Sequence, residues 1–381
     1  MTNDTASGIL ELTDNGAGFL RRREANYLPS NGDLYVRQRL IREFGLRSGD
    51  EIVGTVGNAP GRGKSPPLTK VESVNGRPPQ ETKGRPDFNR LAAIHPNEQL
   101  LLDCDLQRLG QSDYTNRIID LMCPLGKGQR SLIVAPAKAG KTMVLQAIAE
   151  GVAKNYPDAT LMILLVDERP EEVTEMQMIG FGEVIASSFD HPPQRHIAIA
   201  ELVVERARRR VEMGEDVVII LDSITRLARA YNTVEKGTGR TLSGGLDASS
   251  LDKPKKFLGS ARNVDPGQGG GSLTIIGTTL IDTDSRMDQV IFEEFKGTGN
   301  SELVLNRDIA ERRIYPAIEL NASGTRKEER LLPPEMLEAS HEIRQRLADL
   351  PPADAMSQLL TYMKRTKSNE ELVQQVMVAG I

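Results

Sequence analysis

The chain has 381 residues, of which 39% are hydrophobic and 27% are charged, and its formal net charge is -5. This length and composition allow two or three folded domains and exclude a disordered chain. The small negative charge does not by itself indicate a nucleic-acid-binding protein.

Cysteine usage and hydropathy narrow the class of protein further. Cys104 and Cys123 lack the close spacing of a zinc site, which predicts no zinc and indicates a reducing compartment. No run of eighteen or more apolar residues occurs, so no membrane segment or membrane partner is expected. We therefore expect a soluble cytoplasmic protein.

Short apolar runs separated by turn residues dominate the first 75 residues. Strands are predicted at residues 8–12, 18–21, 33–36, 51–56 and 68–71, which together suggest a small β-barrel. Phe19 and Tyr35, with Arg21 nearby, have the side chains that stack bases and contact phosphates of single-stranded nucleic acid. The alternative, that both aromatic residues belong to the barrel core, remains equally open.

Residues 76–87 are rich in Pro, Gly and basic side chains, which predicts an exposed linker. We expect a domain of residues 1–75, this linker, and a second domain of residues 88–381. The C-terminal end of that domain is expected to be helical, at residues 334–350 and 353–365 and after Ser368, with Ser368 and Glu371 as a capping box.

A candidate phosphate-binding loop follows the apolar strand predicted at residues 131–134. The segment Ala135-Pro-Ala-Lys-Ala-Gly-Lys-Thr142 matches G-x-x-x-x-G-K-[ST] except for its first residue, and an apolar helix follows it. Gly140 would let backbone N–H groups approach phosphates, Lys141 would contact the β and γ oxygens, and Thr142 would hold Mg²⁺. The segment therefore predicts ATP and Mg²⁺ as ligands.

Further apolar strands alternate with helical stretches, as in a mostly parallel α/β sheet. They are expected at residues 160–166, 217–221 and 272–278, and two of them are followed by acids. Asp222 is the candidate Mg²⁺-side acid, although it could simply cap the next helix. Glu168 is the candidate general base, although acids also favour the start of a helix.

Several arginines could be either solvent-exposed surface residues or functional residues. Four arginines in the five residues 206–210 are interpreted as a solvated helix face. Arg312, Arg313 and Arg326 could instead act as arginine fingers in a neighbouring subunit's ATP site, although a surface position is the usual role of such residues. The segments 237–252 and 265–271 read as connecting or working loops.

Four long motifs carry a specific resemblance. The segments 167–176 (DERPEEVTEM), 221–232 (LDSITRLARAYN), 293–300 (EEFKGTGN) and 323–328 (SGTRKE) resemble the motifs of the bacterial transcription termination factor Rho family. The phosphate loop is also similar, because that family's loop opens with alanine. The resemblance extends from about Gly8 to the C-terminus.

The resemblance implies a homohexameric, RNA-dependent ATPase and 5′-3′ helicase that acts on single-stranded RNA and on the transcribing RNA polymerase complex, with or without accessory elongation factors. It implies an OB or cold-shock-like RNA-binding domain before a RecA-like P-loop ATPase domain. The catalytic residues implied are Glu168, Lys141, Arg313 and Arg326, with Arg326 as the finger. The nucleotide-binding residues implied are Ala135, Lys138, Ala139, Gly140, Lys141, Thr142, Met143, Asp222 and Tyr315, with Met143 and Tyr315 bracketing the adenine. The RNA-binding residues implied are Phe19, Arg21, Asp33 and Tyr35 on the outer face, and Arg240 and Arg286 in two pore loops, residues 235–247 and 282–286.

The sequence departs from the family pattern in four places. Ala17 stands where the family often has an aromatic residue, and residues 61–67 are basic and Pro-rich where acidic and aromatic residues are common. Few residues precede the barrel, and residues 265–271 are longer and richer in glycine than usual. RNA preference is therefore the least determined property.

Two alternatives remain from the residues themselves. One is a rotary or secretion-type ATPase subunit, which shares the RecA-like core but usually has Gly-Glu-Arg where this chain has Asp167-Glu-Arg169. The other is a non-catalytic RNA-binding or scaffold protein, which the intact Lys141, Glu168 and Asp222 disfavour.

Overall fold

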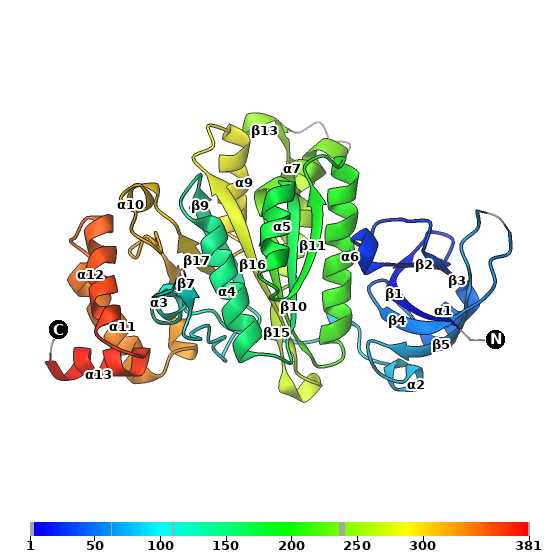
Figure 1. Ribbon diagram of the computed structural model, residues 1–381, viewed down its shortest axis with the longest axis horizontal. Coiled ribbons are helices and arrows are strands. Elements are labelled where there is room, and N and C mark those ends of the chain that lie inside the picture. The colour runs from blue at the N-terminus through cyan, green and yellow to red at the C-terminus, as the bar shows by residue number, and fades with distance from the viewer. Residues whose placement is uncertain (1–3, 62, 109, 236–240, 380–381) are drawn as a thin grey trace.

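The computed structural model describes residues 4–61, 63–108, 110–235 and 241–379. Figure 1 shows three blocks side by side: an N-terminal β-domain, a central α/β sheet and a C-terminal group of helices. Helix α6 (Pro193–Val211) lies between the first block and the central sheet.

The N-terminal block is a five-stranded antiparallel sheet with the order β3-β2-β1-β4-β5. A bridge between Tyr35 and Pro67 brings β3 to the segment before β5, so the sheet curls into a half-barrel. This confirms the predicted OB-like fold. The elements are β1 (Thr5–Leu12), β2 (Gly18–Arg21), β3 (Leu34–Val36), α1 (Gln38–Phe44), β4 (Glu51–Val56), β5 (Leu68–Val74) and α2 (Pro79–Thr82).

The central sheet is RecA-like, as expected, with the order β11-β10-β12-β16-β9-β17-β18. All of these strands except β18 run parallel. The four predicted strands are present, and two more, β11 and β17, flank them. The strands are β9 (Arg130–Pro136), β10 (Thr160–Glu168), β11 (Glu183–Ser188), β12 (Asp216–Asp222), β16 (Ser272–Ile281), β17 (Ser301–Val304) and β18 (Gly324–Thr325), with β6 (Ala93–Ile94) and β15 (Arg262–Val264) paired beside β16.

Alternation along the strands separates two apolar cores, one on each face of the sheet. On β9, Ile133 points into the core shared with the C-terminal helices, whereas Leu132 and Val134 point into the core shared with α6. Burial of both faces explains why these strands are nearly continuous apolar runs. The helices are α3 (Thr115–Met122), α4 (Lys141–Asn155) and α5 (Pro170–Met178) on the first face, and α6, α7 (Ile224–Val234), α8 (Asp252–Gly259) and α9 (Arg286–Lys296) on the second.

The C-terminal block contains α10 (Arg307–Glu311), α11 (Pro334–Leu347), α12 (Pro352–Lys364) and α13 (Asn369–Ala379), close to the predicted helices. Ser368 Oγ accepts the N–H of Glu371, as a capping box requires. In a capping box the Glu371 carboxylate would accept from the backbone N–H of Ser368, but here it accepts from the N–H of Lys367. Two short hairpins complete the chain: β7 (Gln107–Arg108) with β8 (Gln111–Ser112), and β13 (Thr241–Leu242) with β14 (Leu246–Asp247).

The arginines of α6 are not a solvated face, and that interpretation is wrong. Arg206 and Arg209 are buried, and Arg210 pairs with Glu51 of the barrel. Arg206 pairs with Glu183 at 2.8 Å and donates to the hydroxyl of Tyr27. The helix was amphipathic in sequence, but its arginine face meets carboxylates and the barrel instead of water.

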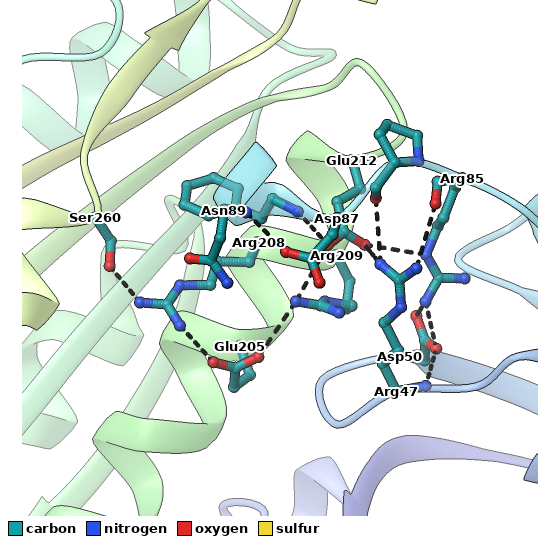
Figure 2. Close-up of polar contacts among 12 residues, drawn as sticks. Arg47, Asp50, Arg85, Asp87, Asn89, Glu205, Arg208, Arg209, Glu212 and Ser260 are labelled. Atoms are coloured by element: carbon teal, nitrogen blue, oxygen red, sulfur yellow. Dashed lines mark hydrogen bonds and ion pairs between the residues drawn. The ribbon is translucent and has the colours of Figure 1, made fainter. Parts of the chain in front are cut away.

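The predicted linker is also less exposed than expected, because Arg85 is buried between the two domains. Its guanidinium contacts Asp50 of the barrel at 2.7 Å and Glu212, just after α6, at 3.0 Å (Figure 2). Glu212 also pairs with Arg47 at 3.0 Å and with Arg209 at 3.2 Å. We call Arg47, Asp50, Arg85, Arg209 and Glu212 the interface cluster.

A glycine permits this close contact. Gly49 has φ +90, and a Cβ there would lie 2.3 Å from the backbone carbon of Glu205 in α6. Any side chain would therefore push the barrel away from α6, so the residue must be glycine.

The Gly-rich segment 265–271 lies at the edge of the sheet, next to β6. Gln268 Oε1 accepts from the N–H of Ala92, and Asp265 donates its N–H to the carbonyl of Ala92. Within the described ranges, none of the helices has the length and hydropathy needed to span a lipid bilayer.

Candidate functional site

The predicted phosphate loop connects β9 to α4 at the carboxyl edge of the sheet. Lys138 and Gly140 both adopt left-handed backbone conformations, with φ of 65 and 88. Gly140 caps α4 without a side-chain hydrogen bond, so the N–H groups of the first turn have no side-chain acceptor. Such a helix N-terminus favours an anion through its unpaired N–H groups and its dipole.

Three charged side chains meet beneath this loop. The Lys141 ammonium lies 2.6 Å from Asp222 Oδ1 at the end of β12 and 3.3 Å from Glu168 Oε1 at the end of β10. Thr278, from β16 between these strands and β9, donates its hydroxyl to Asp222 Oδ1 at 2.6 Å. The structure thus brings together the lysine and both acids that the sequence singled out.

The electrostatics of Glu168 suit proton transfer. Its side chain is almost fully buried, and burial, followed by the neighbouring Asp222 carboxylate, raises its pKa to about 7. Lys141 and Arg226 act in the opposite direction. A carboxylate with a pKa near neutrality is well matched to a general base.

Lys141 is held as a cation by the same two acids. Burial opposes its charge, but Asp222 and Glu168 outweigh burial and raise its pKa. Phosphate oxygens could replace these carboxylates as partners without changing the charge that the lysine requires.

The predicted adenine bracket lies beside the loop. A Cβ on Gly140 would sit 3.4 Å from the ring of Tyr315 and 4.0 Å from the sulfur of Met143. Both side chains are half-buried. The structure therefore places both side chains beside the loop glycine, where an apolar, polarizable sulfur and an aromatic ring are available to a base.

The predicted Mg²⁺ ligands are two side chains that carry oxygen atoms. Thr142, in the first turn of α4, and Asp222 supply a hydroxyl and a carboxylate. In the described residues, no group of three or more His, Cys, Asp or Glu side chains is arranged to hold a metal. This donor set fits Mg²⁺, which usually retains waters and takes one or two protein ligands plus substrate phosphates.

Arg326 lies far from the phosphate loop of its own chain. It follows β18, whose Thr325 pairs with Ser301, and Ser301 pairs with Ser131 at the amino end of β9. The seven residues of β9 span about 20 Å, so Arg326 cannot reach Glu168 of the same chain. Both Arg326 and Arg313 are exposed, as an arginine acting on a neighbouring subunit must be.

Sequence reasoning missed two residues of the acid cluster and one beside the bracket. Arg226, in α7, lies 3.1 Å from Asp167 and 3.2 Å from Glu168. Arg226 belongs to the conspicuous 221–232 segment, but its role appears only when α7 lies against the end of β10. Thr278 contacts Asp222, as described above, and Arg108 donates to the carbonyl of Met143 at 2.6 Å.

The aromatic pair of the barrel lies outside its core. Phe19 and Tyr35 are paired across β2 and β3, with ring centroids 5.7 Å apart, and both are half-buried. The barrel core is formed instead by alternate residues such as Leu20 and Leu34. Of the two alternatives left open, the core role is therefore wrong, and the rings remain accessible for stacking.

The polar neighbours of this pair are already neutralised. Arg21 is buried between the carboxylates of Glu11 and Asp33, and its guanidinium lies 5.2 Å from the Phe19 ring centre. Phe19, Arg21, Asp33 and Ser65 border a hollow of about 230 Å³. Ala17 is buried and adds no stacking surface.

Parts of the two predicted pore loops lie against each other at the carboxyl edge of the sheet. Arg286 is the exposed first residue of α9, and a Cβ on Gly244 would lie 2.5 Å from the backbone nitrogen of Met287. Asp288 fixes this end of α9 through ion pairs with Arg229. Arg240 lies outside the described residues.

Two family models match the chain. Residues 6–80 match the Rho termination factor RNA-binding domain, and residues 115–325 match the ATP synthase alpha/beta family nucleotide-binding domain. Solved structures with a similar fold include an ATPase of a bacterial type III secretion system, with TM-score 0.61 and 22% identity over 82% of this chain and 94% of that chain. ATP synthase subunit NeqB from Nanoarcheaum equitans gives TM-score 0.53 and 19% identity over 69% of this chain and 64% of that chain.

Curated relatives are much closer in sequence. A transcription termination factor Rho of Gemmatimonas aurantiaca is 53% identical over 97% of this chain, and one of Mycobacterium tuberculosis is 49% identical over 97%. The chain spans 50% and 61% of these two proteins, respectively. A third, from Cereibacter sphaeroides, is 49% identical over 96% of this chain and 85% of its own length.

Proposed function

The chain belongs to the transcription termination factor Rho family, and on that premise we propose that it is an RNA-dependent ATPase that terminates transcription. It would act as a homohexameric ring that moves 5′-3′ along single-stranded RNA, separates RNA from its hybrid with DNA, and meets the transcribing RNA polymerase in the cytoplasm. The observation that carries this proposal is the cluster of Lys141, Glu168 and Asp222 under an open phosphate loop, in a chain that also presents the Phe19–Tyr35 pair.

The proposed functions are divided between the two domains. We propose that residues 1–75 bind RNA, that residues 76–87 connect the domains, and that residues 88–381 form the motor. The accessible rings of Phe19 and Tyr35 offer stacking surfaces that accept any base. Segments 241–247 and 282–286 lie together at the same sheet edge as the phosphate loop, which would connect RNA contacts in a ring centre to the state of the ATP site.

The chemistry would be attack of water on the γ-phosphate of ATP. Lys141 would exchange its two carboxylate partners for phosphate oxygens and stabilise the charge that develops there. Glu168, released from the lysine, would orient the attacking water and accept its proton. Mg²⁺, bound through Thr142 and Asp222, would supply neutralisation of the phosphate charge.

Two further arginines complete the proposed site. Arg226 contacts Asp167 and Glu168 in the same chain and would position the base. Arg326 of an adjacent subunit would contact the transferring phosphate, because its own chain cannot present it to its own loop. ATP hydrolysis would then require assembly of subunits.

The decisive experiment compares ATP turnover with poly(C), poly(U), duplex DNA and no nucleic acid, at one stated salt concentration because phosphate contacts are salt-dependent. We expect turnover to depend on single-stranded RNA and to be lost in the Lys141→Ala variant. Equal turnover under all four conditions would contradict the RNA motor and favour the secretion-type alternative, whose resemblance here is one of fold. Absence of turnover with saturating RNA would favour a non-catalytic RNA-binding protein.

A further inference from the structure

A second cavity, of about 570 Å³, lies at the edge of the sheet opposite the phosphate loop. It is bordered by the start of β9, the residues before β17, and strands β6 and β15. Its lining includes Arg130, Arg262, Arg330, His95 and Asn300, and none of its described lining residues is acidic. We call it the amino-edge pocket.

Among the described residues, the side-chain hydrogen bonds of Arg130 and Arg262 all go to backbone carbonyls. Arg130 donates to the carbonyls of Thr298 at 2.9 Å and Ala261 at 3.4 Å. Arg262 donates to the carbonyls of Ser260 at 3.3 Å and Phe88 at 3.4 Å, and its guanidinium lies 4.3 Å from the Phe88 ring centre.

No acid compensates these charges. In the described part of the chain, no carboxylate lies within 4 Å of the guanidinium groups of Arg130, Arg262 or Arg330. Burial, followed by the charge of Arg326, lowers the pKa of Arg130. Burial, followed by Arg208 and Arg130, lowers the pKa of Arg262. The pocket therefore concentrates positive charges that repel one another, which is unfavourable unless an anion binds.

The pocket is held in place by backbone and amide contacts. Asn300 Oδ1 accepts from Gln129 Nε2 at 2.7 Å and from the N–H of Arg130 at 2.9 Å. This arrangement turns the Asn300 NH₂ group away from these two donors and leaves it available as a donor. Gly128, with φ +86, lets β9 begin directly against β15, because a Cβ there would lie 2.2 Å from the nitrogen of Asn263.

We propose that the amino-edge pocket is a second anion-binding site, apart from the phosphate loop of the same chain, and that it takes an oligophosphate group. Guanidinium groups bind phosphate oxygens in pairs of parallel hydrogen bonds, and an amide donor adds a further contact. The cavity has the size of a small-molecule site and can hold more than one phosphate. Such a group belongs to a free nucleotide, whereas the backbone of RNA offers only single phosphodiesters.

A local fluorescent reporter tests this proposal in the full chain. The sequence contains no tryptophan, so Ala93→Trp, at an exposed position that borders the pocket, would provide the only indole signal. Titration with inorganic pyrophosphate should give a saturable change. Arg262→Gln and Arg330→Gln, each in this background, should raise the apparent Kd about tenfold, because each removes a charge-assisted contact.

Controls separate this site from the ATP site and from general charge effects. Arg365→Gln removes an exposed arginine at the end of α12 and should leave the apparent Kd unchanged. A second reporter, Tyr315→Trp, should show pyrophosphate binding at the phosphate loop that Arg262→Gln and Arg330→Gln do not affect. Arg330 is exposed, so its replacement should fold normally even if Arg262→Gln does not.

The source of the phosphate is distinguished by competition. Displacement of pyrophosphate by tripolyphosphate but not by a 12-nucleotide RNA supports an oligophosphate ligand, and equal displacement by the RNA would contradict it, because single phosphodiesters would then be sufficient. The proposal is overturned if the Ala93→Trp signal does not respond to pyrophosphate, or if it responds equally in the wild-type and Arg330→Gln backgrounds.

Discussion

The interface cluster and the amino-edge pocket are both rich in buried or half-buried arginine, but the arginines of the two regions differ in whether carboxylates pair with them. In the interface cluster, Glu212 alone contacts Arg47, Arg85 and Arg209, and Asp50 contacts Arg85 (Figure 2). In the amino-edge pocket, Arg130 and Arg262 donate to backbone carbonyls, and no acid among the described residues pairs with them.

This difference separates arginines that hold the structure together from arginines that are ready for a ligand. A buried charge without a counter-charge is costly, so a folded protein either supplies the partner or leaves the charge where a ligand can reach it. The ATP site combines the two solutions, because Lys141 has two acids as partners until phosphate oxygens replace them.

The largest effect is expected at the ATP site. Glu168→Gln keeps the shape of the side chain but removes the proton acceptor, so RNA-stimulated turnover should fall about 10²-fold to 10⁴-fold. The measurement is steady-state ATP hydrolysis at saturating RNA, with ATP binding followed separately. Retained ATP binding is the control, and unchanged turnover would show that Glu168 only balances the charge of Lys141.

The next largest effect is expected in the interface cluster. Glu212→Ala leaves three arginines without their shared, fully buried acid, so the free energy of unfolding should fall by about 3–5 kcal/mol. Glu215→Ala is the matched control, because the partly exposed Glu215 carboxylate pairs, within the described part of the chain, with Arg210 alone at 3.3 Å, and its loss should cost less than about 1 kcal/mol. Urea unfolding of both variants measures the difference, and equal losses would mean that burial of the acid does not matter here.

The pH dependence should follow Glu168. Because its pKa in the ligand-free site is about 7, kcat/KM for ATP should rise with pH through that value as the carboxylate loses its proton, and at pH 6 it should be about a tenth of its maximum. The raised pKa also has a consequence for stability. The folded state binds this proton more tightly than the unfolded state, so the contribution of Glu168 is present below pH of about 4.5 and is lost as pH rises through about 7. A profile of kcat/KM for ATP between pH 5.5 and 8.5 checks the first effect, and a profile that is flat around pH 7 would contradict it.

The sequence predicted well those features that depend on neighbouring residues. The long apolar strands, the Gly140-Lys141-Thr142 turn and the acids at strand ends follow from local pattern. Strand β17 was missed because four residues with two polar positions carry too little pattern, and β11 because Glu183 and its serines weaken the apolar run.

The roles of arginines depend on distant partners, which the sequence could not provide. Four arginines on one helix look like a solvated face until Glu51, Glu183 and Glu212 lie against them. In the same way, Arg226 becomes part of the site only where α7 lies beside the end of β10. Phe19 and Tyr35 could be assigned to the outer face only after the curl of the sheet determined which side is the core.

The smallest expected effect is the one that most sharpens the contrast between the two arginine clusters. Arg330 is exposed and borders a pocket without acids, so Arg330→Gln should change the free energy of unfolding by no more than about 0.5 kcal/mol, in the direction of greater stability because one repulsive charge is removed.

Added pyrophosphate should then reverse the order of the two proteins. A ligand that binds only the folded state stabilises it in proportion to its affinity, so the unfolding midpoint of the wild type should rise more than that of Arg330→Gln. Urea unfolding with and without pyrophosphate, in the same ionic strength, measures both shifts. Identical shifts would mean that the uncompensated arginines of the amino-edge pocket do not bind the anion, and the distinction between paired and ligand-ready arginines would then fail at this site.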